Sequence, residues 1–230
     1  MPMTEKTASR KTAKKTAEAA RPYHHGSLPH ALLDAAEAVL RRDGIGALTL
    51  RAIAREAGVS HTAPQHHFGN TAGVLSELAA LGNLRLAATM AEKAEGARGT
   101  NVRRKAMARG YVAFALKNPD LMRFMSRNEM LDSDRPALIE SRRIAGRALA
   151  GVFGDASEAP PGKGTFGCMP AAQAVTMTVS WAFVHGLVML LIDGCLKSLA
   201  ASAEGVRSAE DLVDAAIEHA QISLGKLDTL

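Results

Sequence analysis

Residues 50–60 read Leu50-Arg-Ala-Ile-Ala-Arg-Glu-Ala-Gly-Val-Ser60, and this stretch decides the fold of the N-terminal part of the chain. Its apolar residues recur at the spacing of one helical face, and Thr49 precedes them at the position of an N-cap. Gly58 permits the positive φ of a tight turn, and Ser60 is placed to cap a second helix. The pattern predicts a helix-turn-helix, whose second helix fits the major groove of DNA. An ordinary corner between two helices is the alternative for this stretch alone.

The rest of the chain also shows the apolar spacing of helices, and no alternating strand pattern persists. Only 4% of the residues are aromatic and alanine is abundant, which favours helix over strand. Further helices are predicted over residues 28–43, 71–95, 171–192 and 208–224, with two or three more between 101 and 150 and a loop at 151–170. The sequence therefore predicts an all-α fold of about nine helices.

Composition bounds the class of protein. Hydrophobic residues make up 47% of the 230, enough for a sizeable core, which excludes a globally disordered chain. The two cysteines, Cys168 and Cys195, exclude a disulfide framework and a cysteine-based zinc site. Residues 1–21 lack the apolar segment of a secretory signal, so we expect a cytoplasmic protein.

Positive charge is concentrated at the N-terminus. Residues 1–22 hold six of the 28 basic residues and two of the 23 acidic ones, a net +4 out of the total of +5. We interpret this segment, called the arm below, as disordered until it meets a polyanion, with Lys11, Lys14 and Lys15 as contacts. A tail that only aids solubility is the alternative.

Four motifs lie in order over residues 23–78. They are Tyr23-His-His-Gly-Ser-Leu28, Leu32-Leu-Asp-Ala-Ala36, Leu48-Thr-Leu-Arg-Ala-Ile-Ala-Arg-Glu-Ala-Gly-Val-Ser60 and His67-Phe-Gly-Asn70. Together they resemble the TetR family of transcriptional regulators. The later run Trp181-Ala-Phe-Val-His-Gly-Leu187 is similar to one in the regulatory domain of a subset of that family. The resemblance implies a dimer with a DNA-reading head at 23–82, which includes the start of helix four, and a ligand-binding and dimerisation domain at 83–230.

The resemblance also implies roles for residues of the head. Thr49 would touch a phosphate, the front of helix three would face the groove, and His67 would contact the DNA backbone. The candidate DNA contacts in the head are Thr49, Arg51, Ser60, His61, Thr62, Gln65, His66, His67 and Thr71, and the charge of the arm adds Lys11, Lys14 and Lys15.

Two of these positions depart from the family pattern. Family members usually carry Tyr at the position of Gln65 and Lys at the position of Thr71, and both of those residues contact the DNA backbone. Each lost phosphate contact lowers the salt dependence of binding by about one unit, and the arm is a candidate replacement. Gln65 alternatively reads an adenine edge.

The histidines of the head do not predict a metal site. Zinc needs three or four ligands that converge on one point, whereas His61 and His66 are poorly spaced for one helical face and His66 and His67 diverge. Residues 164–192 carry no charge and are long enough to span a membrane. Polar residues interrupt this run and no Lys/Arg cluster flanks it, so we expect a central dimer helix and no membrane partner.

Soft apolar residues of the C-terminal part suggest a ligand pocket, since the resemblance implies a cavity between these helices. The candidates are Met107, Tyr111, Phe114, Met122, Met125, Met177, Trp181 and His185. Trp181, Tyr111, His185 and Gln173 would orient the ligand, which we expect to be small and apolar. The alternative for each single residue is an ordinary helical core.

The helices at 171–192 and 208–224 are expected to meet their symmetry mates as a four-helix bundle. The predicted dimer residues are Val179, Leu187, Leu212, Ala216 and Ala220. The alternative is that the stripe on the last helix packs within one subunit.

These features predict a regulator that binds a palindromic operator as a dimer, most simply a repressor released by its effector. A transcriptional activator and a non-specific nucleic-acid-binding protein are the alternatives. An enzyme is not expected, because the sequence has no Gly-rich phosphate loop, no nucleophile elbow and no HExxH motif, and neither cysteine has an assigned base. We expect no cofactor and no metal.

Overall fold

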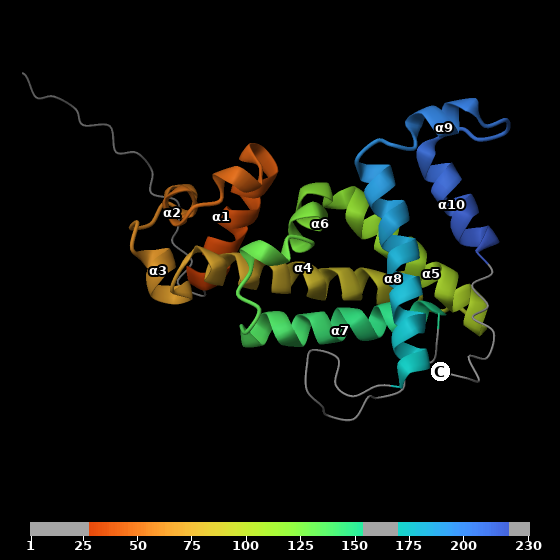
Figure 1. Ribbon diagram of the computed structural model, residues 1–230. Helices are drawn as coiled ribbons and strands as arrows, with labels where there is room; N and C mark the ends of the chain where they lie inside the picture. The colour runs from red at the N-terminus through yellow and green to blue at the C-terminus, as the bar shows by residue number, and fades with distance from the viewer. Residues whose placement is uncertain (1–27, 154–169, 221–230) are drawn as a thin grey trace, which may run out of the picture.

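The computed structural model describes residues 28–153 and 170–220. Within these ranges the chain forms ten α-helices and two 3-10 helices and contains no strand, which confirms the all-α prediction. The helices are α1 (Leu28–Asp43), η1 (Ile45–Ala47), α2 (Leu50–Ala57), α3 (Ala63–Phe68), α4 (Thr71–Lys93), α5 (Thr100–Lys117), α6 (Pro119–Met125), η2 (Asn128–Met130), α7 (Pro136–Phe153), α8 (Ala171–Ile192), α9 (Lys197–Ser202) and α10 (Ala209–His219). Figure 1 shows α1 to α3 at one end of an elongated molecule, with α4 running from them into the larger helical body.

Side-chain caps begin three of the helices, α2, α4 and α10, at the positions that the sequence predicts. The backbone N–H of Ala52 donates to the Thr49 hydroxyl at 3.1 Å, which begins α2, and Gly58 ends that helix at φ 67°. The Ser208 hydroxyl accepts from the N–H of Asp211 at 3.0 Å and begins α10. Asn70 caps α4 through the N–H of Gly73 at 2.8 Å.

The start of α3 differs from the prediction. The helix begins at Ala63, with Thr62 as its N-cap, rather than directly after Ser60. The Ser60 hydroxyl bonds to the Thr62 hydroxyl at 3.2 Å instead of capping the backbone, and Pro64 occupies the first turn. Residues 60–62 therefore form a turn, and α3 is short.

Other boundaries also differ from the sequence-based expectation. The segment expected to be a loop from residue 151 is helical up to Phe153, and residues 154–169, including Cys168, lie outside the described residues. Helix α9 was not predicted. It begins shortly after Gly194, whose φ of 75° turns the chain away from the axis of α8. Helix α10 ends at His219 rather than near residue 224, and residues 221–224 are not described.

The head packs around one side of α1. Leu32, Ala36 and Val39 are fully or almost fully buried and join Ile53 of α2 and Phe68 of α3 in the same hydrophobic cluster. This cluster continues along α4, so the head and the body share a core. That continuity makes α4 a rigid connection between the two parts.

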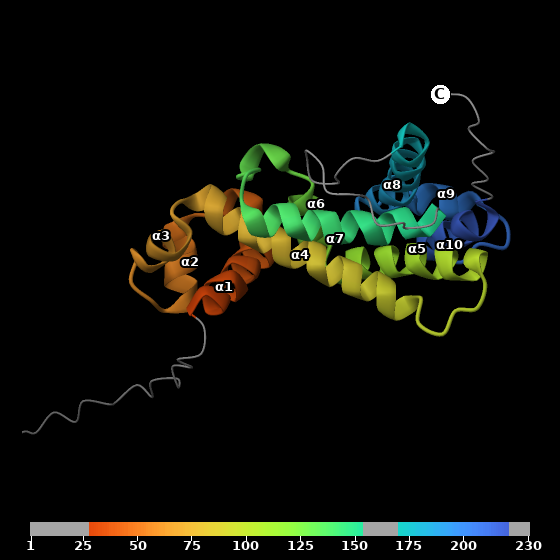
Figure 2. The same cartoon turned by 90° about the horizontal axis from the view of Figure 1, so that it is seen from below.

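In the body, α4 packs against α5 and α7, and α8 crosses over α5 and α7 (Figures 1 and 2). Gly110 allows the close approach of α5 to α4, because a Cβ there would lie 2.6 Å from the Cα of Met90. Helix α10 lies against α5 and α8, where Arg109 pairs with Asp214 and Glu218. The body therefore consists of closely packed helices.

Candidate functional site

The first candidate site is the outer face of α3. Pro64 and Phe68 are buried and anchor the helix to the head. The residues that this anchoring leaves exposed are His61, Thr62, Gln65, His66 and His67, together with Ser60 in the preceding turn. All six predicted contacts from the front of helix three are thus brought together on one solvent-facing surface.

The predicted contacts outside α3 are less uniform. Thr49 and Arg51 are exposed at the start of α2, where the Thr49 oxygen already accepts the capping bond and its O–H is left to donate. Thr71 is only half-buried at the start of α4. Lys11, Lys14 and Lys15 lie outside the described residues.

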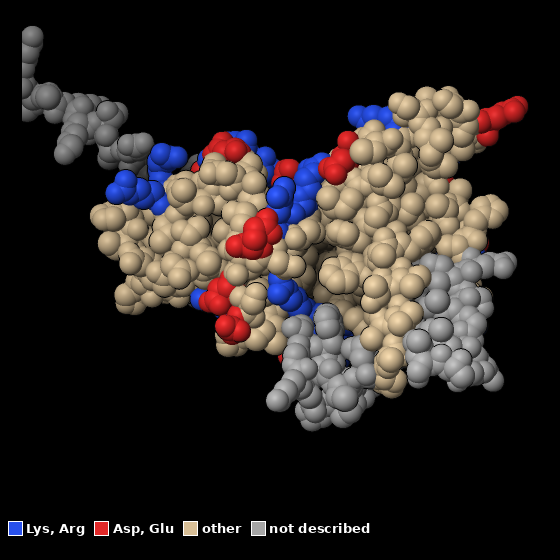
Figure 3. Space-filling view, viewed as in Figure 1, with Lys and Arg blue, Asp and Glu red and all other residues tan. Residues whose placement is uncertain are grey.

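The head itself is not basic. Residues 28–82 carry four arginines and five acidic residues, and Arg42 pairs with both Asp43 and Glu56. Figure 3 shows basic and acidic side chains together along the edge of the head on the face in view. Attraction to a polyanion therefore depends on a few arginines and on the arm.

Arg135 connects the end of α3 to the body. Its Nε donates to Glu77 Oε1 of α4 at 2.7 Å, and its Nη1 donates to the carbonyl oxygen of Phe68 at 3.3 Å. Beside it, the N–H of Asp132 donates to the Ser76 hydroxyl at 2.8 Å. The segment between η2 and α7 is thus hydrogen-bonded to both ends of the α3–α4 junction.

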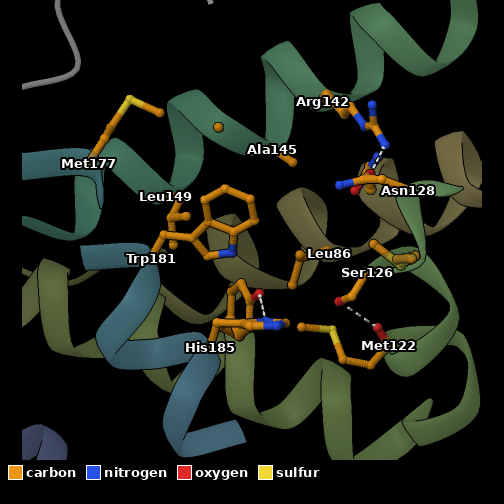
Figure 4. A pocket seen from close by; sticks show the side chains of 14 residues that line it. Leu86, Met122, Ser126, Asn128, Arg142, Ala145, Leu149, Met177, Trp181 and His185 are labelled. Atoms are coloured by element: carbon orange, nitrogen blue, oxygen red, sulfur yellow. Dashed lines mark hydrogen bonds between the residues drawn. The ribbon is translucent and has the colours of Figure 1, made fainter. Parts of the chain in front are cut away.

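The second candidate site is a pocket in the body with a volume of about 440 Å³. Side chains from α4, α5, α6, α7 and α8 line it (Figure 4). They are Asn83, Leu86, Tyr111, Met122, Met125, Ser126, Asn128, Arg142, Ala145, Gly146, Leu149, Met177, Trp181 and His185. Its volume lies within the range of small-molecule sites.

Six of the eight predicted pocket residues line this pocket, whereas Met107 and Phe114 do not. Both are buried in the core, at 6% and 3% exposure. They flank Tyr111 on the inner face of α5, and helical spacing identifies that face without showing which part of it borders a cavity. The side chain of Gln173 lies outside the described residues.

Sequence reasoning missed the contribution of α7, above all Arg142. A signal was present, because Arg142 lies on the same stripe as Leu138, Ala145 and Leu149, where an apolar residue is expected. A charged residue on an otherwise apolar helical stripe indicates either an internal partner or a binding site.

An aromatic cluster forms one wall of the pocket. Tyr111 Oη and His185 Nδ1 are 3.0 Å apart, and the Trp181 and His185 rings meet edge-on at 6.3 Å. Burial raises the pKa of Tyr111 and lowers the pKa of His185 below its usual 6.5. Both groups are therefore neutral at physiological pH and serve as hydrogen-bonding groups within an aromatic wall.

The predicted dimer residues fall into two groups. Val179 on α8 is 36% exposed, and Leu187 is half-buried. Leu212 and Ala216 on α10 and Ala220 directly after it are half-buried, while Val213 and Ile217 are buried within the same chain. Part of the α10 stripe thus packs inside the subunit, and among the predicted dimer residues only Val179 on α8 is exposed.

Two family models match the chain, one on each of these sites. Residues 32–78, which hold the exposed α3, match "Bacterial regulatory proteins, tetR family", and residues 105–216, which hold most of the pocket, match "Tetracyclin repressor-like, C-terminal domain". The chain belongs to the TetR family. This TetR-family protein is a transcriptional regulator that binds DNA through its helix-turn-helix, and the family consists of regulators rather than enzymes.

Solved structures share the fold over most of their length. A protein of unknown function from Rhodococcus sp. RHA1 is 32% identical, with a TM-score of 0.65, over 86% of this chain and 96% of its own. A TetR family transcription regulator from Marinobacter aquaeolei VT8 is 15% identical, with a TM-score of 0.53, over 83% and 91% of the two chains. A bacterial regulatory protein of the tetR family from Rhodococcus RHA1 is 15% identical, with a TM-score of 0.52, over 83% and 93%. The last two support the fold alone.

No curated protein matches this TetR-family chain in sequence. Among the residues that the structure describes, no helix has the length and apolar character needed to cross a membrane. The same residues contain no group of three or more His, Cys, Asp or Glu side chains arranged to hold a metal ion.

Proposed function

We propose that this regulator is a ligand-responsive repressor, which binds a palindromic operator as a homodimer and leaves it when a small molecule occupies the pocket. The observation that carries the proposal is the course of α4. This helix begins at Thr71, directly after α3, and lines the pocket with Asn83 and Leu86 (Figure 2). A ligand in the pocket therefore acts on the same rigid helix that positions the head.

The outer face of α3 is the proposed reading surface. Gln65 and His66 offer groups that hydrogen-bond to base edges, and Ser60 and Thr62 add hydroxyls. Since α3 carries no Lys or Arg, the phosphate contacts fall to Arg51, the Thr49 hydroxyl, Thr71, His67 and the arm. We propose that the arm supplies the cations that the head lacks.

The exposed face of α8 is the proposed centre of the dimer. Val175, Val179 and Leu190 are 36%, 36% and 44% exposed and share one side of the helix with Gly186. Figure 3 shows no charged side chain along α8 on the face in view. Burying such a stripe against its symmetry mate removes apolar surface from water, and the small Gly186 permits close approach.

The switch requires that the effector bind two conformers, which differ in the spacing of their heads, with different affinities. Two heads read half-sites about 34 Å apart only when their separation matches one turn of the duplex. A ligand that binds equally to both conformers shifts nothing, so the effector must prefer the mis-spaced one by several kcal/mol for a strong response, about 5.5 kcal/mol for a nearly complete one.

Selection of bound fragments from a random DNA pool tests the DNA part of the proposal. The expected result is a palindrome that the full chain binds in the presence of excess random duplex. Enrichment of no sequence, or loss of binding in competitor, would indicate non-specific binding instead. Transcription in vitro from a promoter that contains the palindrome then separates a repressor, which lowers the transcript, from an activator, which raises it.

The dimer is tested by Val179→Glu in sedimentation measurements. We expect this variant to sediment as a monomer with an unchanged helical spectrum, because it places a charge in the proposed interface. Val102→Glu is the matched control, since Val102 is 56% exposed at the start of α5, and it is expected to remain dimeric. A dimeric Val179→Glu variant contradicts the α8 interface.

A further inference from the structure

Arg142 brings a positive charge to the wall of the pocket without a carboxylate partner. Its Nη2 donates to the neutral Asn128 Oδ1 at 2.5 Å, and it makes no ion pair with any residue that the structure describes. The next residue, Arg143, points to Glu140 and pairs with it at 2.7 Å. The charge of Arg143 is thus balanced by a carboxylate, whereas the charge of Arg142 at the pocket is not.

The surroundings of Arg142 are those of a cation partly removed from water. Burial lowers the pKa of its guanidinium, and no carboxylate offsets this effect. An arginine stays protonated under these conditions, so the charge persists at the wall. A partly dehydrated cation that bonds only to a neutral amide attracts an anion more strongly than one in water does.

The pocket has a polar end and an apolar body. Figure 4 shows Arg142 and Asn128 together at one end and Trp181 and His185 away from them, with Leu86 between and Leu149 beside Trp181. The neutral Tyr111–His185 pair adds no charge at the far side. A molecule that fills this space meets one cation, the neutral polar side chains of Asn83, Ser126 and Asn128, and otherwise rings, thioethers and aliphatic groups.

We propose that the effector is an amphipathic organic anion, whose carboxylate pairs with Arg142 and whose apolar body lies against Trp181 and Leu149. The proposal rests on the effector pocket proposed above and makes its chemistry more specific than the small apolar molecule expected from sequence. The carboxylate replaces the neutral Asn128 oxygen as the acceptor, and the planar guanidinium offers two parallel N–H groups to it.

A purely structural role for Arg142 is the competing explanation. The Arg142–Asn128 bond joins α7 to the start of η2, and this connection alone would account for an arginine at this position. The two explanations differ in one measurable respect, namely whether the charge of the bound molecule matters.

The chain contains a single tryptophan, Trp181, and it lines the pocket, so its fluorescence reports occupancy directly. The probes are straight-chain carboxylates from hexanoate to dodecanoate and 2-naphthoate, each titrated beside its methyl ester at pH 7.5. The ester keeps the carbon skeleton and removes the charge. We expect at least one acid to bind roughly tenfold or more tightly than its ester, as a charge-assisted pair predicts.

Arg142→Met supplies the second arm of the experiment, since methionine keeps apolar bulk and removes the charge. The variant is expected to bind the acids and the esters alike, with the preference for the acid lost and ester affinity kept within about threefold. Arg143→Met is the matched control on the same helix and is expected to keep the preference. Asn128→Ala removes the neutral acceptor and is also expected to keep the preference for the acid.

The proposal is overturned if no acid quenches Trp181, if acids and esters bind equally to the parent protein, or if Arg142→Met weakens both to the same degree. Thermal melting of each variant shows whether loss of binding follows loss of fold. Operator binding separates this proposal from the proposed function. An acid that binds through Arg142 without changing operator affinity supports the anion site and contradicts the switch.

Discussion

Arg135 donates a hydrogen bond to the carbonyl oxygen of Phe68 at 3.3 Å, which links the segment before α7 to the last residue of α3. The same side chain pairs with Glu77 on α4. The side chains of Arg135 and Glu77 are 21% and 27% exposed. Three elements therefore meet at one guanidinium: the exposed helix, the helix that connects it to the body, and the segment that leads from the pocket residue Asn128. On the proposed function, Arg135 would couple a change at the pocket to the head.

Arg135→Ala is expected to lower operator affinity about tenfold and to lower the free energy of unfolding by about 1–3 kcal/mol, because it leaves Glu77 and the Phe68 carbonyl without this partner. Fluorescence anisotropy with labelled operator and urea denaturation measure the two effects. Arg207→Ala is the control, since Arg207 is 88% exposed and pairs with Asp211, four residues further along the chain. It is expected to change the unfolding free energy by less than about 0.5 kcal/mol. Unchanged operator affinity in Arg135→Ala would remove the proposed coupling.

His66→Ala is expected to weaken binding to the selected operator by about tenfold or more, as the loss of a base-edge contact in each half-site predicts. Its melting temperature should stay that of the parent, because His66 is exposed. Asn101→Ala, an exposed residue at the start of α5, is the control and should bind normally. Equal affinity of His66→Ala and Asn101→Ala for the operator would show that α3 does not read DNA through this position.

Deletion of residues 1–22 is expected to lower DNA affinity and to flatten its dependence on salt. Each lost phosphate contact lowers the slope of log K against log salt by about 0.9. The remaining head carries one more acidic than basic residue over residues 28–82, so it has little charge with which to compensate. The affinity for DNA is measured with and without the arm between about 50 and 200 mM salt, where binding depends steeply on salt. An identical slope with and without the arm would assign it no role in binding DNA.

Gly110→Ala is expected to destabilise the protein by about 1–3 kcal/mol, because the new Cβ would lie 2.6 Å from the Met90 Cα and backbone cannot move aside. Gly46→Ala is the control, since a Cβ there meets nothing within 4 Å. Thermal and urea denaturation should show a loss only for Gly110→Ala. Equal stability of the two variants would mean that α4 and α5 do not approach as closely as described.

Acidification is expected to destabilise the protein through His185. Burial lowers the pKa of His185 in the folded state, so the unfolded chain binds its proton first as the pH falls below about 6.5. The stability that the neutral ring contributes is thus complete above that pH and is lost as the pH falls through the folded-state pKa. The melting temperature of His185→Gln should decline less between pH 7.5 and 5 than that of the parent. His219→Gln, at the exposed end of α10, should follow the parent. Parallel declines in parent and His185→Gln would contradict this assignment.

Several elements of this protein were predictable because their causes are local. Thr49, Gly58 and Ser208 set helix ends through bonds or φ values within a few residues, and apolar spacing defined the inner faces of α1 and α2. The family resemblance implied that Gln65 and His66 face the DNA, and both are exposed on α3. These features determined the fold class and the candidate DNA-reading helix.

The tertiary structure decided what depends on neighbours distant in sequence. Helical spacing placed Met107, Tyr111 and Phe114 on one inner face of α5. The positions of α7 and α8 decide that, of these three, Tyr111 borders the cavity and the other two are buried in the core. Arg142 is another example, because whether an arginine meets a carboxylate or faces a pocket depends on side chains from other helices. Sequence determined the periodic and capped parts of this molecule, since those energies act within a turn of helix. The pocket and its charge arose from long-range packing, which no local pattern encodes.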